Sequence, residues 1–74
     1  MREKDEIQLL NSVGEKIRDL RNQKNLSQAT LSYDANIPKN QIGRIERGDI
    51  NTSILTLNKI CKALEIPLIE LFKI

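Results

Sequence analysis

The chain has no histidine and no tryptophan, and it has only one cysteine, one tyrosine and one phenylalanine. The lack of histidine excludes catalysis by an imidazole base and any metal site that needs an imidazole ligand. The single cysteine, Cys61, excludes an intramolecular disulfide and with it the disulfide-stapled fold of small secreted proteins. We therefore expect no enzyme, no cofactor and no metal, although chemistry between lysine and aspartate side chains stays open.

Long apolar runs are also lacking. No stretch approaches the roughly 18 apolar residues of a membrane span. The first six residues are of mixed charge and lack the apolar core of a signal peptide. These absences predict a cytoplasmic protein with no membrane partner. A chain of 74 residues suffices for one small domain.

Charge is nearly balanced over the whole chain, with 12 basic and 10 acidic residues, but it is unevenly distributed. From Lys16 to Arg47, seven basic side chains stand against three acidic ones, so this stretch carries a net charge of +4. A surface for nucleic acid would lie in this stretch. An ordinary solvated helical face explains the same charges, and charge alone favours that interpretation.

Apolar residues recur at helical spacing, and no period-2 alternation or hairpin turn indicates a strand. The first helix is expected to begin at Ser12, which forms a capping box with Glu15, or somewhat earlier. Residues 1–11 are then an N-terminal extension or the early part of this helix. Asn25 is expected to end it in a left-handed conformation. The apolar stripe of this helix consists of Val13, Ile17 and Leu20.

Two short helices follow, separated by a tight turn. Ser27 is expected to cap the second helix, and Asn36 tolerates the positive φ that a sharp turn requires. Pro38 opens the third helix, because its missing N–H needs no partner in the first turn, and Gly48 ends that helix. The inward residues of the second helix are Leu31 and Ala35.

The last third of the chain predicts two more helices. Thr52 or Ser53 caps the fourth helix, and Pro67 opens the fifth. The inward residues are expected to be Ile54, Leu57, Ile60, Cys61 and Leu64 in the fourth helix, and Leu71 and Phe72 in the fifth. Five helices with short connections predict a compact all-α domain over residues 12–74.

The third helix, residues 38–47, has two dissimilar sides at about 100° per residue. The side predicted to be buried holds Pro38, Ile42, Ile45 and Glu46. The opposite side holds Asn40, Arg44 and Arg47, with Lys39 beside them and Gly43 at the edge. Arginine, lysine and asparagine are the side chains that read base edges in the major groove. A surface helix usually mixes charges, so the absence of acids over residues 39–44 favours groove contact.

Four further residues have expected roles. A buried carboxylate at Glu46 needs a partner, and Arg21 is best placed to supply it. Gln28 opens the second helix, where backbone N–H groups favour a DNA phosphate, although a solvent-exposed glutamine is as plausible. Tyr33 either touches a sugar or phosphate or packs on the surface.

Several segments, in order, resemble the Cro/CI-type (xenobiotic-response-element) helix-turn-helix family. The resemblance covers about Val13 to Phe72. The matching segments are Leu26-Ser27-Gln28-x-x-Leu31, Ile37 at the turn, Ile42-Gly43-Arg44-Ile45-Glu46-Arg47-Gly48, Thr56-Leu57-x-x-Ile60-x-x-Ala63-Leu64 and Leu71-Phe72.

The resemblance implies a five-helix, lambda-repressor-like domain whose second and third helices form the helix-turn-helix, a short stand-alone member of the family. It implies a homodimeric transcription regulator, such as a repressor, on double-stranded palindromic operator DNA, with helix 38–47 in the major groove. By position, Lys39, Asn40 and Arg44 would contact bases, Ser27, Gln28, Arg47 and Asn51 would contact phosphates, and Arg21 and Glu46 would form an internal ion pair.

Departures from the family pattern concern two surfaces. Asp49 and Ile50 follow Gly48 where a basic pair is common, which predicts lower non-specific affinity for DNA. Leu55 and Ile69 replace residues that are often acidic, and exposed apolar residues usually mark a contact surface. We expect a dimer interface made by Leu55, Leu68, Ile69 and Ile74, with core packing of Leu68 and fraying of Ile74 as the alternatives.

A second function from a different class stays open. The apolar surface of the fourth and fifth helices also suits a protein-interaction module, such as an antitoxin-like partner. The chain ends after the fifth helix, so no small-molecule effector is expected. The sequence does not distinguish repression from activation and does not specify an operator.

Overall fold

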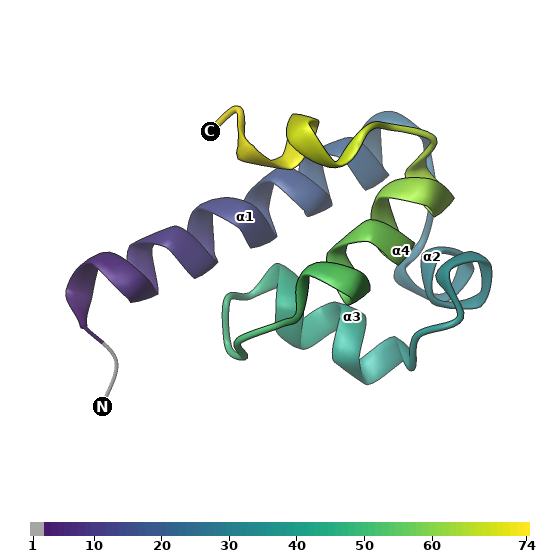
Figure 1. The fold of residues 1–74 in the computed structure, drawn as a ribbon. Coiled ribbons are helices and arrows are strands. Elements are labelled where there is room, and N and C mark those ends of the chain that lie inside the picture. The colour runs from purple at the N-terminus through teal and green to yellow at the C-terminus, as the bar shows by residue number, and fades with distance from the viewer. Residues whose placement is uncertain (1–2) are drawn as a thin grey trace.

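The computed structural model describes residues 3–74 as four α-helices followed by a 3₁₀-helix, with no strand among them (Figure 1). The all-α prediction is confirmed, but the count of five α-helices is wrong, because the last segment is a five-residue 3₁₀-helix. The elements are α1 (Lys4–Gln23), α2 (Gln28–Ala35), α3 (Lys39–Glu46), α4 (Ile54–Leu64) and η1 (Leu68–Phe72).

Helix α1 begins earlier than the Ser12 capping box predicted. Its capping box joins Glu3 and Glu6, and the helix runs unbroken for 20 residues. Residues 3–9 are exposed, and Figure 1 shows this end of α1 extending past the other helices. The early-helix alternative for the N-terminal stretch is thus correct from Lys4 onward, whereas residues 1–2 of the predicted extension lie outside the described residues.

Local signals place the other helix ends as expected. The Ser27 and Ser53 hydroxyls accept hydrogen bonds from backbone N–H groups three residues on, so Ser53, not Thr52, caps α4. Asn36 has φ 57° and Gly48 has φ 73°, the left-handed conformation that ends a helix. Asn25 is also left-handed, one residue after the C-cap of α1. Pro38 occupies the N-cap of α3 rather than its first helical position.

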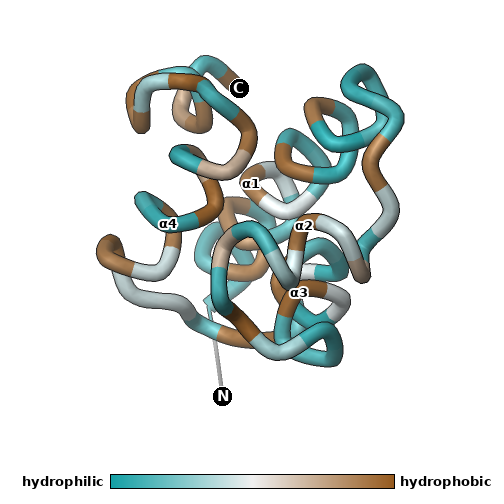
Figure 2. Tube along the Cα trace, turned by 90° about the vertical axis from the view of Figure 1, so that its right-hand side faces the viewer, coloured by the Kyte–Doolittle hydropathy of each residue, from teal (hydrophilic) through white to brown (hydrophobic). Residues whose placement is uncertain are grey.

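The core joins one face of every helix, and Figure 2 shows apolar and polar residues alternating along each of them. Three predictions of burial are wrong: Ile54, Phe72 and Pro38 are exposed. Ile54 lies in the first turn of α4, before that helix reaches the core, and the 3₁₀ winding of η1 turns Phe72 outward while Leu71 stays buried. The fully buried side chains are Ile17, Leu31, Ile42, Glu46, Ile60, Cys61, Leu64 and Leu71.

Gly14 allows α1 and α3 to cross closely. A Cβ atom at this position would lie 2.8 Å from the carbonyl carbon of Glu46 and closer still to the carbonyl oxygens of Ile45 and Glu46. A side chain of any size would therefore push the two backbones apart. This crossing sets the position of α3 relative to α1.

Candidate nucleic-acid interface

The outer face of α3 carries positive charge and no acid. Lys39, Asn40, Arg44 and Arg47 are all exposed. Together with Gln28 and Gly43 they line a shallow hollow of about 370 Å³. The structure thus brings five residues predicted to contact DNA (Gln28, Lys39, Asn40, Arg44 and Arg47) to one surface.

Gly43 forms the floor of this hollow. It is buried rather than at the edge of the exposed face, as the helical spacing suggested. A Cβ atom here would lie 3.2 Å from Nη1 of Arg47 and 3.6 Å from Oε1 of Gln28. Because glycine has no side chain, these two long side chains lie over the α3 backbone and the hollow stays open.

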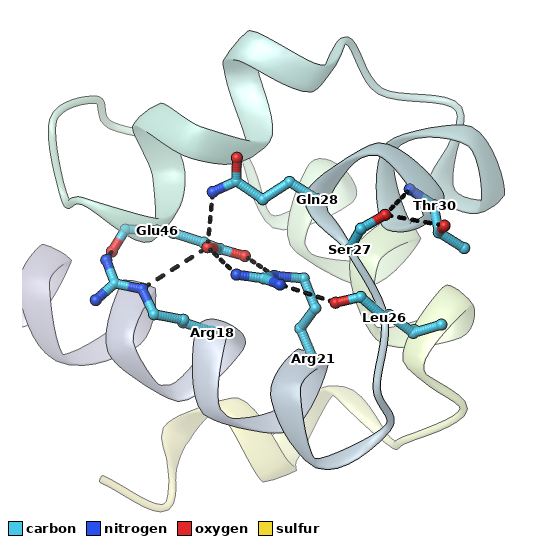
Figure 3. Close-up of polar contacts among 7 residues, drawn as sticks. All are labelled: Arg18, Arg21, Leu26, Ser27, Gln28, Thr30 and Glu46. Atoms are coloured by element: carbon cyan, nitrogen blue, oxygen red, sulfur yellow. Dashed lines mark hydrogen bonds and ion pairs between the residues drawn. The ribbon is translucent and has the colours of Figure 1, made fainter.

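Glu46 anchors α3 from its inner side (Figure 3). It is 1% exposed, and both carboxylate oxygens accept hydrogen bonds from Arg21 of α1. Nε of Arg21 lies 2.7 Å from Oε2 and Nη2 lies 3.0 Å from Oε1. Arg21 also donates to the carbonyl oxygen of Leu26 at 2.8 Å, which ties the start of the helix-turn-helix to α1. The hydrogen bond to Glu46 raises the pKa of the Arg21 guanidinium above its usual value.

Gln28 takes part in the same network. Its Nε2 donates to Oε1 of Glu46 at 3.1 Å, so the amide group expected to face a phosphate is held by α3 in this structure. Arg18 joins from α1, with Nε 3.8 Å from Oε1 of Glu46 and Nη2 donating to the Glu46 carbonyl oxygen at 3.4 Å. Figure 3 shows side chains from α1 and α2 converging on this one carboxylate.

The other three residues predicted to contact phosphates lie in three different settings. Arg47 pairs with Asp49, with Nε and Oδ2 2.9 Å apart and both side chains about half exposed. The Ser27 hydroxyl is engaged in capping α2. Asn51 is exposed but lines a separate hollow with Glu6, Leu9 and Leu10. Asn51 is therefore not part of the α3 surface.

Apolar side chains gather on α4 and the C-terminal segment. Leu55, Ile69 and Ile74 are exposed, as a dimer interface would require. Leu68 is half-buried and packs against the core. Ile54 and Phe72 add two exposed apolar side chains that the sequence reading assigned to the core. In Figure 2 the start of α4 and the η1 segment both lie on the left side of the tube.

Sequence reasoning missed Arg18 and Gly14, and it identified Asp49 only as a departure from the family pattern, not as the partner of Arg47. Arg18 lies three residues before Arg21 on the same face of α1, a spacing that could have indicated a second partner for Glu46. Gly14 interrupts the apolar stripe of the first helix, and a glycine inside a helical pattern often marks close packing. Asp49 is two residues from Arg47, and its pairing depends on the left-handed turn at Gly48.

Comparison with known proteins also identifies a helix-turn-helix in this chain. A family profile described as "Helix-turn-helix" matches residues 17–71. The chain belongs to this helix-turn-helix family. The predicted Cro/CI-type membership is thereby confirmed. Over 52 residues, which are 69% of this chain, the sequence is 40% identical to the control protein C.BamHI of Bacillus amyloliquefaciens. The chain spans 64% of the length of that relative.

Solved structures show the same fold. The restriction–modification controller protein C.AhdI of Aeromonas hydrophila is 38% identical, with a TM-score of 0.84 over 85% of this chain and 96% of that one. The controller protein C.Esp1396I is 34% identical, with a TM-score of 0.81 over 88% of this chain and 86% of that one, in a structure of its tetramer with a natural 35 base-pair operator. Among residues 3–74 of the present chain, no helix has the length and apolar content of a membrane span.

Proposed function

We propose that this helix-turn-helix protein is a sequence-specific regulator of transcription that binds double-stranded operator DNA. The observation that supports this most directly is the acid-free hollow of α3, where three cationic side chains and two amides surround a glycine. Helix α3 is long enough to enter a major groove, and its exposed residues are those that bind base edges. The relationship to C.AhdI and C.Esp1396I, both controller proteins, supports the same assignment.

The exposed residues of α3 divide into two roles. Lys39, Asn40 and Arg44 point outward without an ion pair to another described residue, so we assign them to base edges. Arg47 and the N-terminus of α2 at Gln28 are assigned to phosphates. The amide of Gln28 would then serve two partners, because its Nε2 donates to Glu46 while its backbone N–H stays available at the helix end.

We propose a homodimer as the form that binds DNA. One copy presents a single α3, so it can read one half-site only. Two copies related by a two-fold axis would read a palindrome. The exposed Leu55, Ile69 and Ile74 supply an apolar surface for that contact.

Selection from random duplex DNA tests the function. Repeated binding and amplification should enrich a palindrome with half-sites about one helical turn apart. Arg44→Ala should weaken binding to that site by about 1–3 kcal/mol and relax the preference at one base pair. Lys62→Ala removes one exposed positive charge from the last turn of α4 and serves as the control. Enrichment of no sequence, or unchanged preference in Arg44→Ala, would contradict the assignment.

A protein-interaction module of the antitoxin type is the second candidate. The same apolar residues of α4 and the C-terminal segment favour it, because they could contact a different protein instead of a second copy. The two candidates differ in one measurement. A regulator binds its selected duplex with strong salt dependence, whereas a pure interaction module leaves the selection without an enriched site.

A further inference from the structure

Tyr33, for which the sequence left a sugar or phosphate contact and surface packing as alternatives, is a large exposed side chain of the helix-turn-helix that the proposed function does not yet use. It is 86% exposed, the highest value among the large hydrophobic residues of the described chain. The outward position follows from helix geometry, because Leu31 and Ala35 of the same helix face the core. The exposed ring offers an apolar face for packing, and its hydroxyl can form a hydrogen bond with a ligand.

A second hollow lies beside this ring. Its volume is about 630 Å³, and it runs from Tyr33 to Pro38, the residue that caps α3. The Ser32 hydroxyl donates to the Ile37 carbonyl oxygen at 2.6 Å, which fixes the wall between α2 and α3. The hollow is therefore lined by an aromatic side chain that carries a hydroxyl, Tyr33, and by a proline, Pro38.

The surroundings favour DNA over protein as the occupant. Lys39, which lines the cationic hollow of α3, directly follows Pro38, which lines the hollow beside Tyr33. The other exposed large hydrophobic residues lie outside α2 and α3, so Tyr33 stands alone. A protein interface would require a cluster of apolar residues around it. An isolated ring beside positive charge suits a deoxyribose with its phosphate.

We propose that Tyr33 and Pro38 hold a sugar–phosphate unit of duplex DNA next to the base pairs that α3 reads. The ring would pack on the deoxyribose, and the hydroxyl would donate to a phosphate oxygen. The nearest acid along α2 is Asp34, which projects about 100° away around the helix. This inference rests on the proposed function, because it extends the same DNA surface by one backbone contact.

Tyr33 can be followed alone, because the chain has no other tyrosine and no tryptophan. Nitration by tetranitromethane, located by peptide mass, should fall several-fold when the operator duplex found by selection is bound. An unrelated duplex should protect much less. Unchanged nitration in the operator complex would overturn the proposal. Protection that grows with protein concentration without DNA would also overturn it, because a second protein copy would then be the occupant.

Two variants test the same contact through affinity. Tyr33→Phe removes one hydrogen bond and should weaken operator binding between about twofold and tenfold, and Tyr33→Ala should weaken it further. In neither variant should the slope of the logarithm of the binding constant against the logarithm of salt concentration change, because tyrosine is uncharged. Arg47→Ala, which removes an assigned phosphate contact, should reduce that slope by about 1. Equal affinity of Tyr33→Ala and the original protein would refute the contact. Failure of the selection itself would instead refute the proposed function.

Discussion

Arg21 and Glu46, which are 25 residues apart in sequence, form a bidentate ion pair that joins α1 to α3. The Glu46 side chain is inaccessible to water, and that of Arg21 is 12% exposed. Such a pair fixes an orientation as well as a distance, because the planar guanidinium meets the carboxylate along two parallel hydrogen bonds. The pair therefore holds the cationic side of α3 outward.

Glu46→Gln should destabilise the fold by about 3–5 kcal/mol, because the largely buried guanidinium of Arg21 then has no carboxylate to balance its charge. Urea unfolding followed by circular dichroism measures the change. Glu15→Gln, an exposed acid of α1, is the matched control and should change stability by no more than about 0.5 kcal/mol. Equal midpoints for the two variants would show that the ion pair does not stabilise α3.

Gly14→Ala should destabilise the protein by about 1–3 kcal/mol, because the added methyl group meets the α3 backbone. Alanine favours a helix over glycine by up to about 1 kcal/mol, so any net loss reports the helix crossing itself. Thermal unfolding is the measurement. A higher melting temperature would mean that α1 and α3 can separate at no cost.

Gly43→Ala should have the opposite effect on stability. The nearest atoms to the added methyl group are side-chain atoms of Arg47 and Gln28, at 3.2 Å and 3.6 Å, and not backbone atoms. Helix propensity should therefore raise stability by about 0.5–1 kcal/mol. The same methyl group enters the cationic hollow of α3, so operator affinity should fall if DNA binds there as proposed. A variant that is more stable and binds equally well would exclude close approach of DNA at this glycine.

Asp49→Asn should strengthen binding to all DNA sequences alike. The exposed Asp49 pairs with Arg47, so its replacement removes a negative charge and releases a guanidinium beside the hollow. Titrations of operator and unrelated duplexes at several salt concentrations should show a slope steeper by up to about 1. A gain confined to the operator would place Arg47 at a base instead of a phosphate.

Ile69→Asp should shift the protein toward the monomer and weaken operator binding at low protein concentration. A charge at this exposed apolar position of η1 would be desolvated in the dimer without a partner. Sedimentation equilibrium at micromolar concentration checks this, with Ile7→Asp, an exposed residue of α1, as control. Self-association that survives in Ile69→Asp would place the interface elsewhere.

Stability should decrease at alkaline pH through Cys61. Burial raises the pKa of its thiol above the ordinary value of 9.0, so the folded protein keeps a proton that the unfolded chain loses. The contribution is fully present below pH 9 and is lost as the pH rises beyond it. The urea midpoint of the original protein should therefore fall more between pH 7 and pH 10 than that of Cys61→Ala. Parallel midpoints would show that the thiol does not titrate on unfolding.

Much of the fold could be read from local patterns. Helix ends at Ser27, Asn36 and Gly48 follow from hydrogen bonds and backbone angles within four residues. The row of exposed polar side chains on α3 follows from the helical spacing of 3.6 residues per turn, and predicting it needs no knowledge of the partner helices. These features depend on neighbouring residues only, so the sequence by itself determined them.

Tertiary structure decided the rest, because these contacts join residues far apart in sequence. Gln28 is turned toward Glu46 by a carboxylate 18 positions away, and the role of Gly14 exists only where α3 crosses it. Ile54 fits the apolar stripe of α4, but it is the first residue of that helix and its side chain lies outside the core. Helical spacing states which residues share a face, whereas the packing of the helices decides how far along each face the core extends.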